Sequence, residues 1–124
     1  MVKYMIIIYL LKDSNNIVMQ DELFGPVFVL HVYGNQTQSL LEQEQELIEK
    51  INDVQFGLSS ALYSPNTDMT WKLASQIDTG TVFLNHPSIS TSEIPFGGVK
   101  RSGFGRECGP HAISTFGIVK SLKI

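Results

Sequence analysis

Residues 58–84 read LSSALYSPNTDMTWKLASQIDTGTVFL. Residues 58–63 form a short strand-like run that ends at turn residues, and residues 81–84 form a second apolar run. The segment between these runs has apolar residues at helical spacing. Strand, helix and strand in this order are typical of an α/β fold with a mainly parallel sheet, flanking helices and ligand-binding loops at the strand ends.

The predicted helix between these two strands begins after the turn Ser64–Thr67, which contains residues that cap helix N-termini. The helix is predicted to continue through Ile77. Its inward stripe has three apolar members, Met69, Leu73 and Ile77. Gly80 suits the C-terminal cap, because glycine adopts the left-handed backbone that often ends a helix.

The same alternation of strand and helix occurs nearer the N-terminus. Residues 6–11 are apolar and β-branched without alternation, which predicts a strand covered on both faces, and the polar run 13–16 ends it. Residues 28–33 repeat this pattern and stop at Gly34. Residues 38–51 have the spacing of an amphipathic helix. Its apolar positions are Leu40, Leu41, Leu47, Ile48 and Ile51, and we interpret its glutamates as a solvated face rather than a metal site.

Residues 85–110 lack a regular pattern and are predicted to be a loop region. Five glycines lie here: Gly97, Gly98, Gly103, Gly105 and Gly109. This content is too high for the interior of a helix or strand, so the backbone must turn sharply or approach another group closely. Residues 118–124 contain enough Val, Ile and Leu for a final strand. No repeat or linker marks a second domain, which predicts a single partial domain over residues 1–124.

The composition excludes several classes of protein. Hydrophobic residues make up 43% of the 124 residues, as in ordinary globular domains, and the formal net charge of −3 gives no basic surface for a nucleic-acid backbone. The run at 6–11 is far shorter than the roughly 20 residues that span a bilayer. The single cysteine, Cys108, cannot form an internal disulfide, and no Cys and His spacing suggests a zinc site. We expect a cytoplasmic protein without nucleic-acid, membrane or metal partners.

Four motifs follow one another along the chain: DELFGPV at 21–27, ND and FGL within 52–58, GTVFLN at 80–85 and PFGGVKRSGFGRE at 95–107. Gly109, Phe116 and Lys120 continue the pattern. In this order the motifs resemble the aldehyde dehydrogenase superfamily over about residues 10–124. The resemblance implies NAD(P)-dependent oxidation of an aldehyde to a carboxylate. It also implies that residues 6–117 form the C-terminal part of a catalytic domain and that 118–124 form an oligomerisation strand.

The resemblance gives two residues to the cofactor. Glu22 matches the carboxylate that accepts hydrogen bonds from the nicotinamide ribose, which would orient the nicotinamide for hydride transfer. The chemistry of Glu22 alone favours a solvated acid before a strand, and the motif around it favours the cofactor role instead. Phe24 matches the aromatic residue at the nicotinamide end of the cofactor, although an aromatic at this place can also be a core residue.

Two further residues are implied on the substrate side. Phe96 matches the position that lines the aldehyde entry channel, where an apolar ring helps to exclude water; packing is its alternative role. The loop 85–94 is most similar to the branch that oxidises succinate semialdehyde. In that branch a serine aligned with Ser90 binds the far carboxylate of the substrate, and a merely solvated loop serine is the alternative.

Three other reactive residues receive structural interpretations. Histidine is a common general base, which is one interpretation of His86 and His111. The family reaction needs no histidine at either place, so both are interpreted as loop residues. Cys108 lies where the family does not place its nucleophile, and we interpret it as a small filler residue.

The family reaction also requires a cysteine thiolate, a glutamate base and an N-terminal dinucleotide-binding domain, none of which has a counterpart in these 124 residues. We therefore expect no catalytic residue in this chain, no tight binding of NAD or NADP by it alone, and no activity without another chain. Two departures from the family pattern are a poor match over residues 1–9 and a longer connection at 34–45.

Exposed apolar surface and sheet edge are expected where the rest of the catalytic domain would pack, which favours a homo-oligomer or association with the missing N-terminal part. The alternative function is a non-catalytic interaction module that joins full-length relatives. A small enzyme that uses Cys108 as its nucleophile is a third hypothesis.

Overall fold

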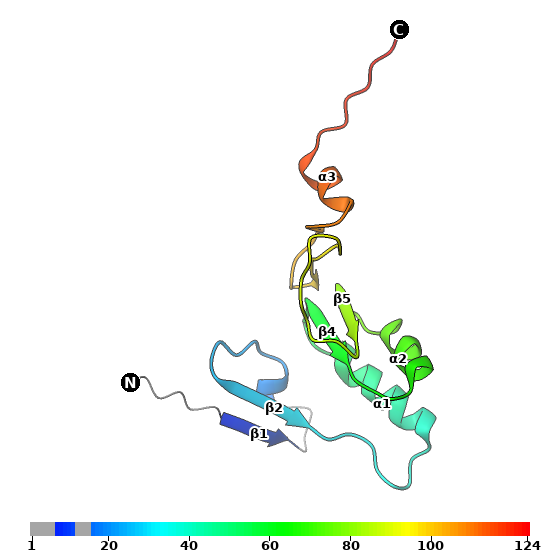
Figure 1. Cartoon of the computed structure of the whole chain (residues 1–124). Helices are drawn as coiled ribbons and strands as arrows, with labels where there is room; N and C mark the ends of the chain where they lie inside the picture. Colours follow the sequence, from blue (N-terminus) through cyan, green and yellow to red (C-terminus); the bar gives the residue numbers. More distant parts are fainter. Residues whose placement is uncertain (1–6, 12–15) are drawn as a thin grey trace. The chain divides into compact units, whose positions relative to one another are not determined.

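A computed structural model of the chain describes residues 7–11 and 16–124. The chain divides into two compact units, Met1–Val54 (unit 1) and Gln55–Ile124 (unit 2), each with its own elements (Figure 1). The single partial domain expected over residues 1–124 stays a prediction. No helix among the described residues is long and apolar enough to cross a membrane.

Unit 1 contains a pair of parallel strands, β1 (Ile7–Leu11) and β2 (Val27–His31), in register from Ile7 opposite Val27 to Leu11 opposite His31. Both predicted strands are thus confirmed, apart from Ile6 and the break at residues 13–15, which lie outside the described residues. A short 3-10 helix, η1 (Ile17–Met19), precedes β2.

The prediction that β2 is covered on both faces was wrong for this chain. Side chains along β2 alternate between partly buried and exposed, and Phe28 and Leu30 are 70% and 53% exposed. The unbroken apolar sequence predicts burial on two sides, but the described chain covers only one of them. The open face is a surface that another polypeptide could cover.

Helix α1 (Leu40–Asn52) confirms the predicted amphipathic helix. Ser39 caps it in a capping box: the Ser39 Oγ accepts from the Glu42 N–H, and the Glu42 carboxylate accepts from the Ser39 N–H at 2.7 Å. The predicted apolar stripe is only partly right. Ile48 is buried, but Leu40 and Leu41 are 77% and 70% exposed because they lie in the first turn, beyond the covered part of the helix.

Unit 2 contains the strand–helix–strand motif that the sequence predicts. Strands β4 (Ser59–Leu62) and β5 (Thr81–Leu84) are parallel and joined by helix α2 (Thr67–Ala74), with Asn66 as its N-cap. The core of the unit contains Leu73 and Ile77, both buried as predicted, and the fully buried Thr70, whose hydroxyl donates to the Thr67 carbonyl at 2.7 Å. Met69 is partly buried.

Two details of this helix differ from the prediction. Helix α2 ends at Ala74 with Ser75 as its C-cap, so the buried Ile77 lies beyond the helix. Gly80 is therefore not the helix cap. It lies just before β5, and its N–H donates to the carbonyl of Gly57 at 3.1 Å.

The rest of unit 2 is mostly loop, as expected. Strands β3 (Phe56–Gly57) and β6 (Val99–Lys100) form a two-residue antiparallel pair, and α3 (His111–Phe116) follows the glycine-rich segment. The predicted final strand at 118–124 is not formed, because a strand needs a hydrogen-bonding neighbour and the described chain offers none there. Ile118 and Val119 are 97% and 96% exposed.

With two parallel pairs, one antiparallel pair and flanking helices, the architecture confirms the predicted α/β class. The mainly parallel sheet is present as separate two-stranded pairs rather than as one continuous sheet.

Candidate functional site

The glycine-rich segment, residues 95–107, packs backbone against backbone. A Cβ added to Gly80 would overlap the carbonyl oxygen of Gly97, and one added to Gly98 would lie 2.5 Å from the carbonyl oxygen of Ser102. Gly57 is equally crowded, since its Cβ would lie 2.5 Å from the Asp78 carbonyl oxygen. These glycines are required by close approach. The sequence predicted this for Gly98, within residues 85–110, but not for Gly57 or Gly80.

A two-residue bridge closes the glycine-rich segment at its base. The N–H groups of Phe96 and Glu107 each donate to the carbonyl of the other at 2.7 Å. Between these residues, the Arg106 guanidinium donates from one nitrogen, Nη1, to the carbonyls of Gly98 at 2.9 Å and Gly105 at 2.7 Å. Backbone hydrogen bonds thus close the loop, and the Arg106 guanidinium links two of its carbonyls from within.

The glycine-rich segment is also attached to the start of unit 2. The Ser102 Oγ accepts a hydrogen bond from the Gly57 N–H at 2.9 Å. Arg101 donates to the Gln55 side chain at 2.5 Å, and its guanidinium lies 5.5 Å from the centroid of the Phe56 ring, a cation–π distance. Because β3 pairs with β6 as well, the segment has several points of attachment there.

A cavity of about 280 Å³ opens beside this segment. It is lined by Leu58, Phe96 to Gly98, Ser102 to Glu107, Thr115 and Phe116. Phe96 is partly buried, whereas Phe104 is 101% exposed and Phe116 is 78% exposed. Phe96 is therefore partly packed and also lies at the cavity wall.

Ser90 lies in the exposed loop that follows β5. The loop begins at Asn85, whose left-handed backbone (φ 51°) turns the chain and whose side chain makes two hydrogen bonds to the backbone of Ser64, at 2.9 and 3.0 Å. It is held again near its end, where the Gly109 N–H donates to the Ser92 carbonyl at 2.8 Å. The Ser92 hydroxyl donates to Glu93, which lowers the pKa of that carboxyl.

Glu22 and Phe24 lie together in unit 1, in the turn before β2. The Gly25 N–H donates to the Leu23 carbonyl at 3.1 Å, a tight turn that presents Phe24 outward. Phe24 is 96% exposed, so it is not a core residue of this chain, and Glu22 is exposed as well. One carboxylate and one aromatic ring are thus both accessible on a single turn.

Residues 6–122 match the model of the aldehyde dehydrogenase family. The chain belongs to this family. It is 42% identical over 87 residues to an NADP(+) succinate-semialdehyde dehydrogenase from Deinococcus radiodurans, which covers 70% of this chain and 17% of that enzyme. The family predicted from the motifs is therefore confirmed.

Solved aldehyde dehydrogenase structures contain the same fold. Succinic semialdehyde dehydrogenase from Streptococcus pyogenes, in complex with NADP+, matches with a TM-score of 0.76 and 33% identity, over 88% of this chain and 22% of that chain. Betaine aldehyde dehydrogenase from Staphylococcus aureus, in complex with NAD+, matches with a TM-score of 0.75 and 30% identity, over 88% and 20% of the two chains. The chain thus spans about a fifth of the length of these aldehyde dehydrogenases.

The family site residues predicted from the sequence fall in both units. Glu22 and Phe24 belong to unit 1, and Ser90 and Phe96 to unit 2. Phe96 lines a cavity and Ser90 precedes it on an exposed loop. Their roles in an aldehyde dehydrogenase site stay predictions.

The three reactive residues interpreted as structural have well-defined surroundings. His86 is exposed, stacks on Phe83 with ring centroids 6.3 Å apart, and has its Nδ1 2.7 Å from the Pro87 carbonyl oxygen. His111 is the exposed first residue of α3. Cys108 is partly buried on a left-handed turn (φ 58°) directly after Glu107.

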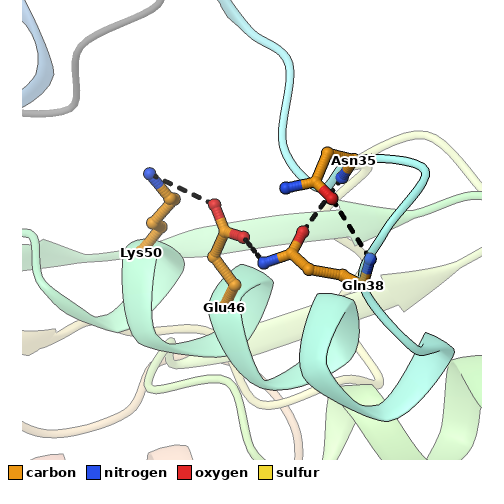
Figure 2. Close-up of polar contacts among 4 residues, drawn as sticks. All are labelled: Asn35, Gln38, Glu46 and Lys50. Carbon is orange, nitrogen blue, oxygen red and sulfur yellow. Dashed lines mark hydrogen bonds and ion pairs between the residues drawn. The ribbon is translucent and has the colours of Figure 1, made fainter.

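The sequence interpretation missed a polar network in unit 1 that joins the connection before α1 to the helix itself (Figure 2). The Gln38 side chain accepts from the Asn35 N–H at 2.9 Å and donates to Glu46 at 3.0 Å, and Glu46 also pairs with Lys50 at 3.6 Å. The hydrogen bond from Gln38 lowers the pKa of Glu46, with a further contribution from Lys50. The spacing of Ser39 and Glu42, a capping-box signature, was the available signal that α1 starts here.

Proposed function

We propose that this chain supplies the C-terminal part of an aldehyde dehydrogenase active site, for oxidation of a short aldehyde that carries a carboxylate at its far end, of the succinate semialdehyde kind. The observation that carries the proposal is the family match over residues 6–122, which includes both the cofactor and the substrate positions. The similarity to two succinate-semialdehyde dehydrogenases supports the substrate class.

Ser90 and Phe96 form the proposed substrate end. The exposed hydroxyl of Ser90 can donate a hydrogen bond to a carboxylate, and a loop anchored by Asn85 limits how far that hydroxyl can move. Phe96 is held by both of its backbone hydrogen bonds to Glu107 and presents an apolar surface to the cavity. Such a ring would keep water from the reacting carbon until hydrolysis.

Glu22 and Phe24 form the proposed cofactor end. A carboxylate with two oxygens fits the paired hydroxyls of a ribose, and an exposed aromatic ring fits the face of a nicotinamide. When bound, NAD or NADP supplies the hydride acceptor, and these two residues orient it. A single turn offers too little surface to hold a dinucleotide tightly, so we propose that a region outside residues 1–124 binds the rest of it.

The thiol that attacks the aldehyde and the base that activates water are likewise proposed to come from outside residues 1–124. Cys108 is a poor nucleophile for this role, because it is partly buried on a turn with no basic group within hydrogen-bond reach in the described contacts. The isolated chain is therefore proposed to be inactive.

One observation favours a second candidate, the non-catalytic interaction module. The apolar residues after α3 are almost fully exposed, including Ile118, Val119 and Leu122 at 97%, 96% and 85%. An extended apolar segment of this kind can add as a strand to a sheet in another subunit. Co-purification with an intact aldehyde dehydrogenase that is lost on deletion of 118–124, without any effect on turnover, would favour this module over the active-site proposal.

Complementation tests the active-site proposal. The chain would be mixed with a succinate-semialdehyde dehydrogenase that lacks the segment corresponding to residues 6–122, and NADH or NADPH formation would be followed with succinate semialdehyde. We expect turnover from the mixture only, with no calorimetric binding of NAD or NADP to the chain alone. Turnover by the chain alone that disappears with Cys108→Ala would instead make it a small enzyme in its own right.

Ser90→Ala then tests the substrate class in the complemented enzyme. We expect KM for succinate semialdehyde to rise about tenfold, because a hydrogen bond to a carboxylate is lost. The matched control is butyraldehyde, which has a similar length but no carboxylate, and its KM should not change. Equal changes for both aldehydes would contradict a carboxylate-binding role for Ser90.

A further inference from the structure

The glycine-rich segment contains two arginines with different surroundings. The guanidinium of Arg101 reaches a side chain and a ring, those of Gln55 and Phe56. The guanidinium of Arg106 instead turns into its own loop and donates to two backbone carbonyls, those of Gly98 and Gly105. A cation that binds carbonyls across a loop restrains the path of the backbone itself.

Arg106 is placed to restrain one particular neighbour. Glu107, the next residue, exchanges both backbone hydrogen bonds with Phe96, and Gly98 is only two residues beyond Phe96. The backbone of Arg106 is held in turn from α3, since the Thr115 hydroxyl donates to the Arg106 carbonyl at 3.1 Å. The segment around Phe96 is therefore fixed on both sides through this one arginine.

The neighbouring glycine makes room for this arrangement. A Cβ on Gly97 would lie 3.1 Å from the Arg106 Cδ, 3.2 Å from its Nη1 and 2.5 Å from the Gly105 carbonyl oxygen. The arginine stem therefore lies directly against the Gly97 backbone, where no side chain fits.

The geometry points to Arg106 as a positioning residue that fixes the glycine-rich segment and thereby holds Phe96 at the substrate cavity. The consequence for the substrate rests on the proposed function, whereas the restraint on the loop does not. Arg106 is not proposed to contact a reacting atom. It acts through the Gly98 and Gly105 carbonyls and the bridge between Phe96 and Glu107.

Amide hydrogen exchange of the whole chain tests the restraint. In Arg106→Met, which keeps an apolar stem but removes the donors, we expect exchange at the Phe96 and Glu107 amides to accelerate about tenfold or more. The reference is the Asn85 amide of the same unit, bonded to the Leu62 carbonyl at 2.7 Å, which should change less than about twofold. Arg101→Met is the matched control, because it removes the same charge from the same segment, and it should leave the Phe96 and Glu107 amides unchanged.

Arg106→Lys is the conservative variant and should restore part of the protection, because one ammonium can still reach a carbonyl. Unchanged exchange in Arg106→Met, equal acceleration at Asn85, or no rescue by lysine would each overturn the positioning role. If Arg106→Met does not fold, the comparison of Arg106→Lys with Arg101→Lys tests the positioning role instead. Faster exchange at the Phe96 and Glu107 amides is expected in Arg106→Lys only. Unchanged exchange in Arg106→Lys would overturn the role.

In the complemented enzyme, Arg106→Lys should raise KM for the aldehyde while KM for the dinucleotide stays constant. A failure of the wild-type chain to complement would contradict the proposed function. The exchange experiment would still test the positioning role of Arg106, because it does not depend on complementation. A failure of the proposed function and a failure of the positioning role can therefore be distinguished.

Discussion

The contacts inside unit 1 differ in kind from the contacts inside unit 2. In unit 1 the connection before α1 is fastened by amide and carboxylate side chains, such as the chain from Asn35 through Gln38 to Glu46. In unit 2 the backbones themselves are in contact, with Gly80 against Gly97 and Gly57 against Asp78. Side chains can rotate to relieve a poor contact, whereas two backbones in van der Waals contact have no such freedom.

This difference separates a tolerant region from an intolerant one. The polar side chains of the unit 1 connection are exposed or only partly buried, so water can replace each one that is lost at small cost. The glycine contacts of unit 2 lie beside the proposed substrate cavity, where a shift of the backbone would move Phe96. We expect substitutions in unit 2 to have larger effects on both stability and function.

Gly80→Ala should have the largest effect. The added methyl would overlap the Gly97 carbonyl oxygen, so β5 and the glycine-rich segment must separate, and we expect a loss of about 3 kcal/mol or complete unfolding of unit 2. Urea denaturation followed by circular dichroism measures it. Gly25→Ala is the control, because its Cβ would meet only Val27 Cγ2 at 4.0 Å. Comparable losses of stability in the two variants would contradict the view that unit 2 is the less tolerant region.

Ser102→Ala should have an intermediate effect. It leaves the Gly57 N–H, in a fully buried residue, without its acceptor, and we expect unfolding to become easier by about 2 kcal/mol. Ser90→Ala removes the same hydroxyl from an exposed loop and should change stability by less than about 0.5 kcal/mol. Urea denaturation measures the free energy of unfolding of both variants. Equal losses would mean that the hydrogen bond from the Gly57 N–H to Ser102 does not stabilise unit 2.

Gln38→Leu should have the smallest effect, limited to acid pH. The pKa of Glu46 is lowered by the hydrogen bond from Gln38, so its stabilisation is present above the unfolded carboxyl pKa, about 4.3, and is lost as pH falls through the lowered folded pKa. Without that donor the folded pKa of Glu46 should rise, and this part of the acid dependence should disappear. An NMR titration of the Glu46 side chain measures the shift.

Gln43→Leu is the control for this titration. Its side chain donates to the carbonyls of Asn35 and Gln38, at 3.3 and 3.1 Å, and thus belongs to the same connection without donating to Glu46. The pKa of Glu46 should stay lowered in this variant. If it rises as far as in Gln38→Leu, the general order of the connection controls Glu46 rather than the single hydrogen bond.

The sequence predicted the elements whose patterns are local. The strand, helix and strand of 58–84 each contain their own signal, in the apolar runs and the Asn66 cap, and they are found in that order. The order of the motifs identified the aldehyde dehydrogenase family for a similar reason. The Gly-rich and Gly-Pro segments are short and continuous, so they can be recognised in the sequence without knowledge of the fold.

Features that depend on distant partners were missed or wrong. Burial on both faces of β2 and the final strand at 118–124 both require a neighbouring polypeptide surface, which a periodicity cannot show to be present. The brace by Arg106 was missed because its partners are backbone carbonyls, which every residue has and which leave no signature in a sequence. Ser102 was likewise hidden, because its partner is an N–H group 45 residues away.

The contact between Gly80 and Gly97 also limits how this part of the molecule can change over time. A clash between two side chains can be repaired by making either one smaller, but here the group opposite Gly80 is the backbone carbonyl of Gly97, which every residue carries. No substitution at position 97 can therefore make room for a side chain at position 80. Gly80 can be replaced only if a whole segment of main chain moves, so a single compensating mutation cannot release this position.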